Sequence, residues 1–160
     1  MKIIADTGPL LSFARADCLD LLQQVVSEVI IPEAVYEEIV VQGAGKPGAH
    51  DVQHASWIIR DHVQDRSLVD ALPGKLHQGE REALALAKEL NGVLLVDEYT
   101  VRQEARRLGI DHMGSLRLLK EAKARSLIPA IKPILEELTA AGMYISETLY
   151  EAFLNDMDEG

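Results

Sequence analysis

The chain has 160 residues, 48% of them hydrophobic, and a formal net charge of −10 at pH 7. This length fits one globular domain rather than two, and the charge argues against holding nucleic acid by bulk attraction. No apolar run is long enough for a signal peptide or a membrane span, and the single cysteine, Cys18, cannot form a disulfide within the chain. We therefore expect one domain over residues 1–160, a cytoplasmic location, no membrane partner and an inert, buried thiol.

Short apolar segments alternate with longer helical patterns along the chain. The predicted strands are residues 2–5, 29–31, 57–59, 93–96 and 109–112. The predicted helices are residues 10–15, 18–25, 32–42, 79–90, 100–108, 115–125, 131–141 and 147–154. Residues 43–48 indicate a flexible loop and residues 72–74 a turn. This alternation predicts an α/β fold, a three-layer α/β/α sandwich around a mainly parallel sheet.

Acidic residues follow two of the predicted strands. Asp6 comes directly after the first strand and precedes the turn sequence Thr7-Gly8-Pro9, and Asp97 comes directly after strand 93–96. Ligands of parallel α/β sheets bind beyond the carboxyl ends of the strands, so both carboxylates are expected at one edge of the sheet. The alternative for each aspartate is a helix N-cap.

Helical phase turns two glutamates inward. At 100° per residue, Glu38 falls inside the apolar arc of helix 32–42, which is formed by Ala34, Val35, Ile39 and Val41. On helix 79–90, Glu80 lies at the edge of the apolar face and Glu82 on the opposite border. An inward carboxylate is costly unless it is paired, protonated or bound to a cation, so a salt bridge or a backbone amide is the alternative for either glutamate.

Two aspartates at the sheet edge and two inward glutamates predict a cluster of four carboxylates. No Lys or Arg lies at the matching inward positions, so a cation is needed to offset their repulsion. Oxygen ligands without Cys or His favour Mg²⁺ or Mn²⁺. Such ions activate water and stabilise charge on a phosphate, so the pattern indicates phosphodiester hydrolysis.

Four motifs in this order resemble the PIN-domain family, over roughly residues 2–130. They are Asp6-Thr7-Gly8-Pro9-Leu10, Pro32-Glu33-Ala34-Val35-Tyr36-Glu37-Glu38-Ile39, Gly79-Glu80-Arg81-Glu82-Ala83-Leu84 and Leu94-Leu95-Val96-Asp97-Glu98. The resemblance implies an endoribonuclease whose metal site is made by Asp6, Glu38, Glu80 and Asp97, with Thr7 as the hydroxyl beside the first aspartate. Glu82 competes with Glu80 for the third position, and Glu98 competes with Asp97 for the fourth.

Many bacterial members that resemble this chain are toxins of toxin–antitoxin pairs and form homodimers. The resemblance therefore implies an RNA substrate, an antitoxin protein as partner and a homodimer. Gly114-Ser115-Leu116 before a helix rich in Ala and Lys is similar to a subgroup described only as predicted nucleic-acid-binding proteins. This second similarity supports nuclease chemistry more than it supports a toxin role.

Charge is unevenly distributed toward the end of the chain. Residues 101–133 carry eight basic and three acidic side chains, whereas the acidic helical segment at about 134–160 carries seven acidic and no basic ones. Arg117, Lys120 and Lys123 line one helix face by their spacing, and Arg102 follows Asp97 closely. We expect nucleic acid to contact Thr7, Arg102, Ser115, Arg117 and Lys120. The alternative is a solvated basic face that offsets the acidic tail.

Several residues also suggest functions other than a nuclease. A noncatalytic PIN-fold module that binds nucleic acid or protein is the main alternative, and metal-dependent cleavage of RNA distinguishes the two. The aspartic-protease triplet Asp6-Thr7-Gly8 belongs to a fold built almost entirely of strands and does not fit. His50 and His54 have the spacing of helical metal ligands, but with no nearby Cys they indicate a surface pair. The four tyrosines are scattered along the chain and predict no stacking platform.

Overall fold

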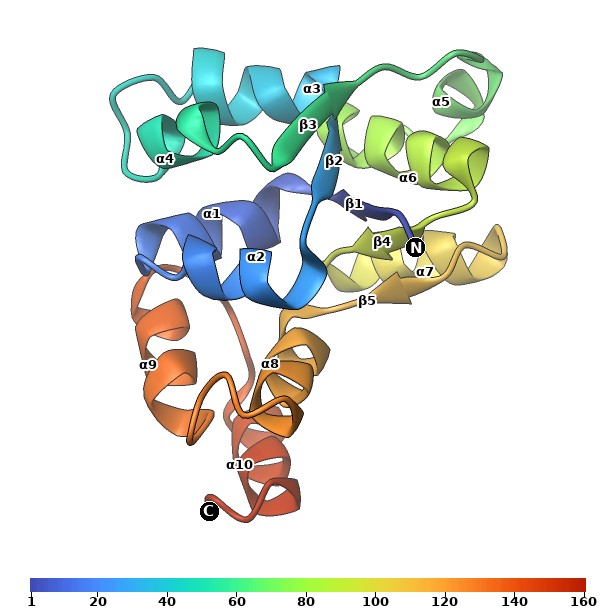
Figure 1. Ribbon diagram of the computed structural model, residues 1–160. Helices are drawn as coiled ribbons and strands as arrows, with labels where there is room; N and C mark the ends of the chain where they lie inside the picture. Colours follow the sequence, from blue (N-terminus) through green and yellow to red (C-terminus); the bar gives the residue numbers. More distant parts are fainter.

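The computed structural model describes all 160 residues and is built around a five-stranded sheet (Figure 1). The strands are β1 (Ile3–Ala5), β2 (Val29–Pro32), β3 (Ile58–Asp61), β4 (Val93–Leu95) and β5 (His112–Met113). Their order in the sheet is β3-β2-β1-β4-β5, and every neighbouring pair is parallel. The predicted α/β fold is confirmed.

Helices connect the strands and follow the last one. They are α1 (Thr7–Arg15), α2 (Leu19–Val26), α3 (Glu33–Tyr36), the π-helix η1 (Glu37–Val41), α4 (Ala49–His54), α5 (Ser67–Ala71), α6 (Gln78–Leu90), α7 (Tyr99–Arg107), α8 (Ser115–Ala124), α9 (Lys132–Ala140) and α10 (Glu147–Asp156). All eight predicted helices are present. The sequence did not predict α4 and α5, because six and five residues are too few to show a helical period.

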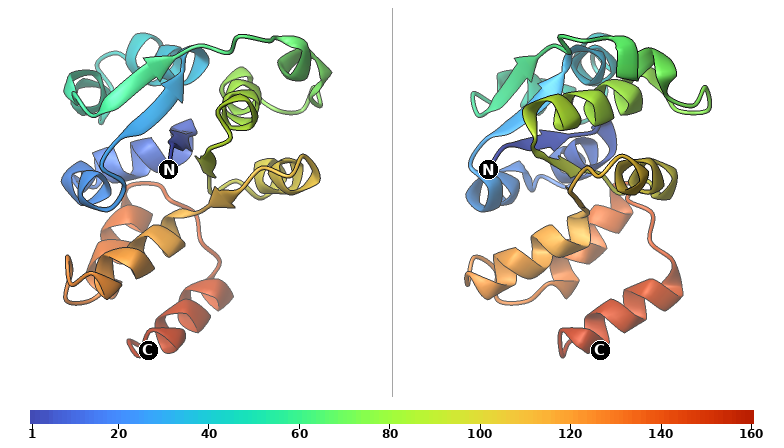
Figure 2. Two further views of the ribbon diagram at one scale, coloured as in Figure 1. Left: turned by 45° about the vertical axis from the view of Figure 1, so that its right-hand side comes forward. Right: turned by 90° about the vertical axis from the view of Figure 1, so that its right-hand side faces the viewer.

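The sheet lies between two layers of helices. Along β1, Ile3 and Ala5 belong to one core cluster, whose helical residues come chiefly from α1, α2, η1, α8 and α9. Ile4 belongs to a second cluster on the other face, formed with α5, α6 and α7. Alternate strand residues point to opposite faces, so these memberships define three layers. Figures 1 and 2 show α3 to α6 gathered at one end of the molecule and α8 to α10 at the other.

The predicted helix 32–42 changes its winding halfway. The Gln42 N–H donates to the Glu37 carbonyl (2.8 Å), five residues earlier, and this bond closes the wider π turn of η1. Val41 is therefore 53% exposed, and its predicted place on the apolar arc is wrong. A Cβ atom at Gly43 would lie 2.4 Å from the Ile39 carbonyl oxygen, so glycine is required where the chain leaves this turn.

The side chain of Glu159 binds the C-terminal residues to the helices before them. Glu159 accepts hydrogen bonds from the N–H groups of Ile131 and Lys132 and pairs with Lys123 (2.7 Å). Desolvation opposes its ionisation, but the bonds from Lys123 and the two amides hold its pKa at about 2. The last residues are thus attached to the start of α9 and to α8.

None of the helices is both long enough and apolar enough to cross a membrane.

The cysteine behaves as the sequence predicts. Cys18 is 7% exposed, and its thiol contacts the Ala16 carbonyl (3.3 Å) and the Glu137 carboxylate (3.7 Å). Burial, with the Glu137 charge and hydrogen bond acting in the same direction, raises the pKa of this thiol to about 11. The thiol is therefore neutral and inert at pH 7.

Candidate active site

A single cavity of about 740 Å³ opens at the carboxyl ends of β1 and β4. Five of the six acids that the motifs offered as ligands line it, together with one hydroxyl: Asp6, Glu38, Glu80, Asp97, Glu98 and Thr7. None of these acids forms an ion pair, and no Lys or Arg belongs to the cavity wall. Negative charge is therefore concentrated here, and no Lys or Arg of the cavity wall offsets it.

Asp6 is the most deeply placed of these acids, with 6% of its surface exposed. It stands at the start of α1, but its side chain does not cap that helix. Burial raises the pKa of Asp6 from 3.8 to about 7, although a hydrogen bond from the Thr7 N–H lowers it. The charges of Glu80, Glu38 and Glu98 also raise it. Asp6 thus sits among like charges.

The first turn of α6 brings two further groups together. A Cβ atom at Gly79 would lie 3.7 Å from both Glu38 Oε2 and Thr7 Oγ1, so these oxygens border the same helix start. The next residue, Glu80, accepts a hydrogen bond from the His77 N–H (2.8 Å) through Oε1. Thr7 Oγ1 is buried and has no hydrogen-bond partner. A buried polar atom without a partner is unusual and marks a place where a ligand can bind.

Asp97 and Glu98 both line the cavity, but they are held differently. Asp97 accepts the Ser115 N–H (2.7 Å) and the Ser115 hydroxyl (2.6 Å), and Ser115 is fully buried. A Cβ at Gly114 would lie 3.0 Å from Asp97 Oδ1, so this glycine permits the close approach. Asp97 therefore caps the start of α8, which is the capping role considered from the sequence but at a different helix. Glu98 is exposed and is the member of this pair that acts on the pKa of Asp6.

Glu82 is not where the helical phase placed it. It is 6% exposed instead of lying on a polar border, and it does not line the cavity. Its carboxylate accepts the Ala34 N–H (3.0 Å), both terminal guanidinium nitrogens of Arg66 (3.2 Å each) and the Gln78 side-chain amide (3.2 Å). The expectation was wrong because the start of α3 and the segment before α5 fold over this side of α6. Glu82 joins α6 to both.

The donor set of the cavity suits a hard divalent cation, because its charged groups are carboxylates and Thr7 adds an unpartnered hydroxyl. As the side chains stand, no three His, Cys, Asp or Glu residues converge closely enough to hold an ion. Repulsion keeps unneutralised carboxylates apart, and the exposed Glu38 and Glu98 can change rotamer at little cost.

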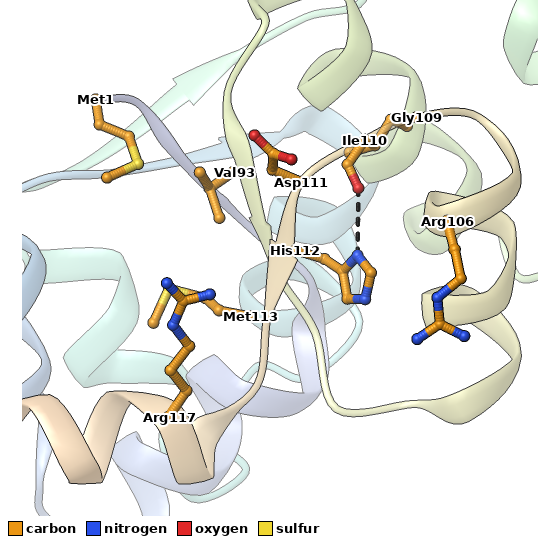
Figure 3. A pocket seen from close by; sticks show the side chains of 9 residues that line it. All are labelled: Met1, Val93, Arg106, Gly109, Ile110, Asp111, His112, Met113 and Arg117. Atoms are coloured by element: carbon orange, nitrogen blue, oxygen red, sulfur yellow. Dashed lines mark hydrogen bonds between the residues drawn. The ribbon is translucent and has the colours of Figure 1, made fainter.

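The predicted basic contacts are divided between separate places. Arg117 lines a different cavity of about 600 Å³ with Arg106, Met1 and His112. Met1 precedes β1, so this cavity lies toward the amino ends of the strands, at the opposite edge of the sheet from the acids. Figure 3 shows Arg117 and Arg106 on either side of β5. The structure does not bring Arg117 to the acidic cavity.

The other cations also differ in their placement. Arg102 approaches Asp97, because a Cβ at Gly114 would meet Arg102 Nη1 at 3.4 Å and Asp97 Oδ1 at 3.0 Å. Lys120 is exposed on α8 and does not line the acidic cavity. Sequence reasoning missed Arg15 and Lys46, which line a cavity of about 250 Å³ that shares Thr7 and Glu38 with the acidic one. They come from the end of α1 and from the glycine loop, which carried no nuclease motif.

Sequence reasoning also missed two aromatic residues. Tyr99 and Tyr144 both line the acidic cavity, with Met143 and Leu149 from the C-terminal part of the chain. Two of the four tyrosines that are scattered along the chain thus border one cavity. The place of Tyr99 just after Asp97 could have suggested its position. Nothing in the sequence pattern links Tyr144 to the acids.

The fold and this cavity define an α/β protein with an acidic pocket at the carboxyl edge of a parallel sheet. The chain belongs to the PIN-domain family, whose profile matches residues 2–159. PIN domains are generally nucleases and generally use divalent metals. The resemblance and the fold predicted from the sequence are confirmed.

One solved structure with a similar fold is a PilT N-terminus domain protein, SSO1118, from the hyperthermophilic archaeon Sulfolobus solfataricus P2. The match has a TM-score of 0.54 and 17% sequence identity, and it covers 92% of this chain and 98% of the other. At that identity it supports the fold alone. No curated protein matches the sequence.

Proposed function

We propose that this protein is a metal-dependent endoribonuclease that hydrolyses RNA phosphodiester bonds with Mg²⁺ or Mn²⁺. The observation that carries the proposal is the environment of Asp6, a buried carboxylate with a pKa of about 7 that faces three other acids and no cation. Such an arrangement costs stability, and an oxygen-coordinated cation removes that cost. We therefore expect this site to bind an ion, and we expect the fold to be less stable without the ion.

Asp6, Glu38, Glu80 and Asp97 are the proposed ligands, with Glu98 as the alternative to Asp97. When bound, a divalent ion supplies positive charge to the phosphate and lowers the pKa of a water. Thr7 offers its free hydroxyl to a phosphate oxygen or to the ion, and Ser115 fixes the direction of Asp97.

The test is cleavage of a labelled single-stranded RNA in Mn²⁺, in Mg²⁺ and in EDTA. The wild type should cleave only with the divalent ions, and Asp6→Asn should reduce the rate at least about 100-fold, the usual scale for losing a charged group that acts in the transition state. Glu37→Gln is the matched control for Glu38→Gln, because Glu37 is exposed on the same π-helix and does not line the cavity. Equal loss in both variants would contradict the assignment.

A noncatalytic binding module is the second candidate. The observation that favours it is that no three potential ligands converge as the side chains stand. RNA binding without cleavage in any divalent ion would establish it. The toxin role, an antitoxin partner and a homodimer are further proposals that rest on the resemblance to bacterial toxins. A neighbouring short gene for a DNA-binding antitoxin, together with the mass of the particle in solution, tests them.

A further inference from the structure

Two of the four tyrosines have largely exposed rings, and both border the acidic cavity. Tyr99 is 71% exposed and Tyr144 is 88% exposed. The other two are packed: the Tyr36 ring lies against the Arg60 guanidinium, 3.6 Å from the ring centroid, and Tyr150 packs on the larger core cluster. The exposed tyrosine rings of the chain are therefore concentrated at one place.

Tyr144 projects from a backbone that is fixed on both sides. Gly142 turns the chain with a φ of +115°, and the next residue, Met143, is 8% exposed and donates its N–H to a carbonyl of α9 (3.0 Å). Beyond Tyr144, the Ser146 hydroxyl accepts the Leu149 N–H (3.2 Å) and caps α10. The backbone that carries Tyr144 is thus held on both sides, although no side chain covers the ring.

Tyr99 is held in a different way. It is the first residue of α7 and follows Glu98, one of the acids of the cavity. Its hydroxyl accepts a hydrogen bond from the Gln103 side-chain amide one turn later. This bond restricts the ring and leaves it open to solvent.

We propose that Tyr99 and Tyr144 are the base-stacking residues of the site and hold unpaired nucleobases of RNA beside the phosphodiester that faces the acids. The inference rests on the proposed nuclease function and adds the residues that select the substrate. Nucleobases are neutral and the cavity wall has no Lys or Arg, so a base held there is bound through contacts without charge. Stacking on an aromatic ring supplies such a contact, and the faces of unpaired bases are free to make it.

The experiment measures binding without cleavage. A fluorescently labelled oligoadenylate is titrated with wild type, Tyr99→Ala and Tyr144→Ala in Ca²⁺, its integrity is checked on a gel, and the dissociation constant is read from anisotropy. Tyr99→Phe and Tyr144→Phe keep the ring. Tyr36→Ala is the matched control, because it removes the same side chain at a place that does not line the cavity. A strand of the same length with abasic sites in place of adenines is the second probe.

Each alanine variant should weaken binding of the oligoadenylate by roughly 5- to 150-fold, the range that corresponds to the loss of one aromatic stack. The phenylalanine variants and Tyr36→Ala should bind as the wild type does. On the abasic strand the wild type should already be weak, and the alanine substitutions should cause no further loss. Because the rings of Tyr99 and Tyr144 are exposed, the variants at these two positions should melt near the wild-type temperature.

Wild-type affinity of both alanine variants for the oligoadenylate would overturn the proposal and leave a protein partner as the better occupant of these rings. An equal loss on the abasic strand would overturn it too, because the contact would then be to the backbone. A wild type that binds through the tyrosines but never cuts RNA in Mn²⁺ would refute the nuclease and leave this inference standing.

Discussion

Two buried carboxylates, Asp6 and Glu82, are equally hidden from solvent, each with 6% of its surface exposed, yet they lie in opposite surroundings. Glu82 accepts hydrogen bonds from one backbone amide, one guanidinium and one side-chain amide. Asp6 faces three other acids and has a pKa of about 7. Burial alone does not mark a functional acid. The charges around it do, because a paired carboxylate has a structural use and a crowded one needs a ligand from outside.

The comparison is sharpest between Glu80 and Glu82, which are two residues apart on α6. Glu80→Gln should lower the rate of RNA cleavage at least about 100-fold and leave the melting temperature nearly unchanged. Glu82→Gln should keep most activity per folded molecule but lose about 1.5–3 kcal/mol of unfolding free energy, because it removes the charge that Arg66 and two amides bind. Single-turnover kinetics and urea unfolding check both. A Glu82→Gln protein that is stable and inactive would reverse the two roles.

The pH dependence of stability should report on the surroundings of Asp6. The pKa of Asp6 rises from 3.8 in the unfolded chain to about 7 in the fold, so its contribution is present at low pH and is lost as the pH rises through 7. In EDTA at pH 8, Asp6→Asn should therefore melt several degrees above the wild type, and the gap should shrink as the pH is lowered toward 4. Thermal melts at four or five pH values measure it. A gap that is constant with pH would mean that the ionisation of Asp6 costs the fold nothing.

The smallest expected effect concerns two pairs of basic residues, Arg15 with Lys46 and Arg117 with Lys120. If a phosphate is held by Arg15 and Lys46, their double alanine variant should flatten the slope of log affinity against log salt by about 1.4, or roughly 0.7 per contact on single-stranded RNA. We expect a smaller change for Arg117→Ala/Lys120→Ala, because Arg117 lines the cavity at the amino ends of the strands. Salt titrations of RNA binding in Ca²⁺ compare the pairs. A larger change in slope for Arg117→Ala/Lys120→Ala would support the RNA contacts expected from the sequence.

The sequence was informative where local rules decide position. Asp6 and Asp97 directly follow parallel strands, and the edge at which parallel strands end is shared, so their common cavity could be predicted. Glu82 could not be placed from helical phase, because what buries it is Arg66 and the start of α3, which are distant along the chain. Val41 was misplaced because a π turn changes the angle per residue. Tyr144 reaches the cavity only through the turn between α9 and α10, which leaves no periodic signal.

The measurement that tests the central claim most directly is the effect of Mn²⁺ on the melting temperature of wild type and Asp6→Asn at pH 8. A cation that binds the folded site and relieves repulsion around Asp6 should raise the wild-type melting temperature by several degrees as its concentration passes the dissociation constant. Asp6→Asn should start higher in EDTA and rise much less, so that the order of the two proteins reverses at saturating Mn²⁺. An equal rise in both proteins would contradict the claim that Asp6 is the centre of a metal site.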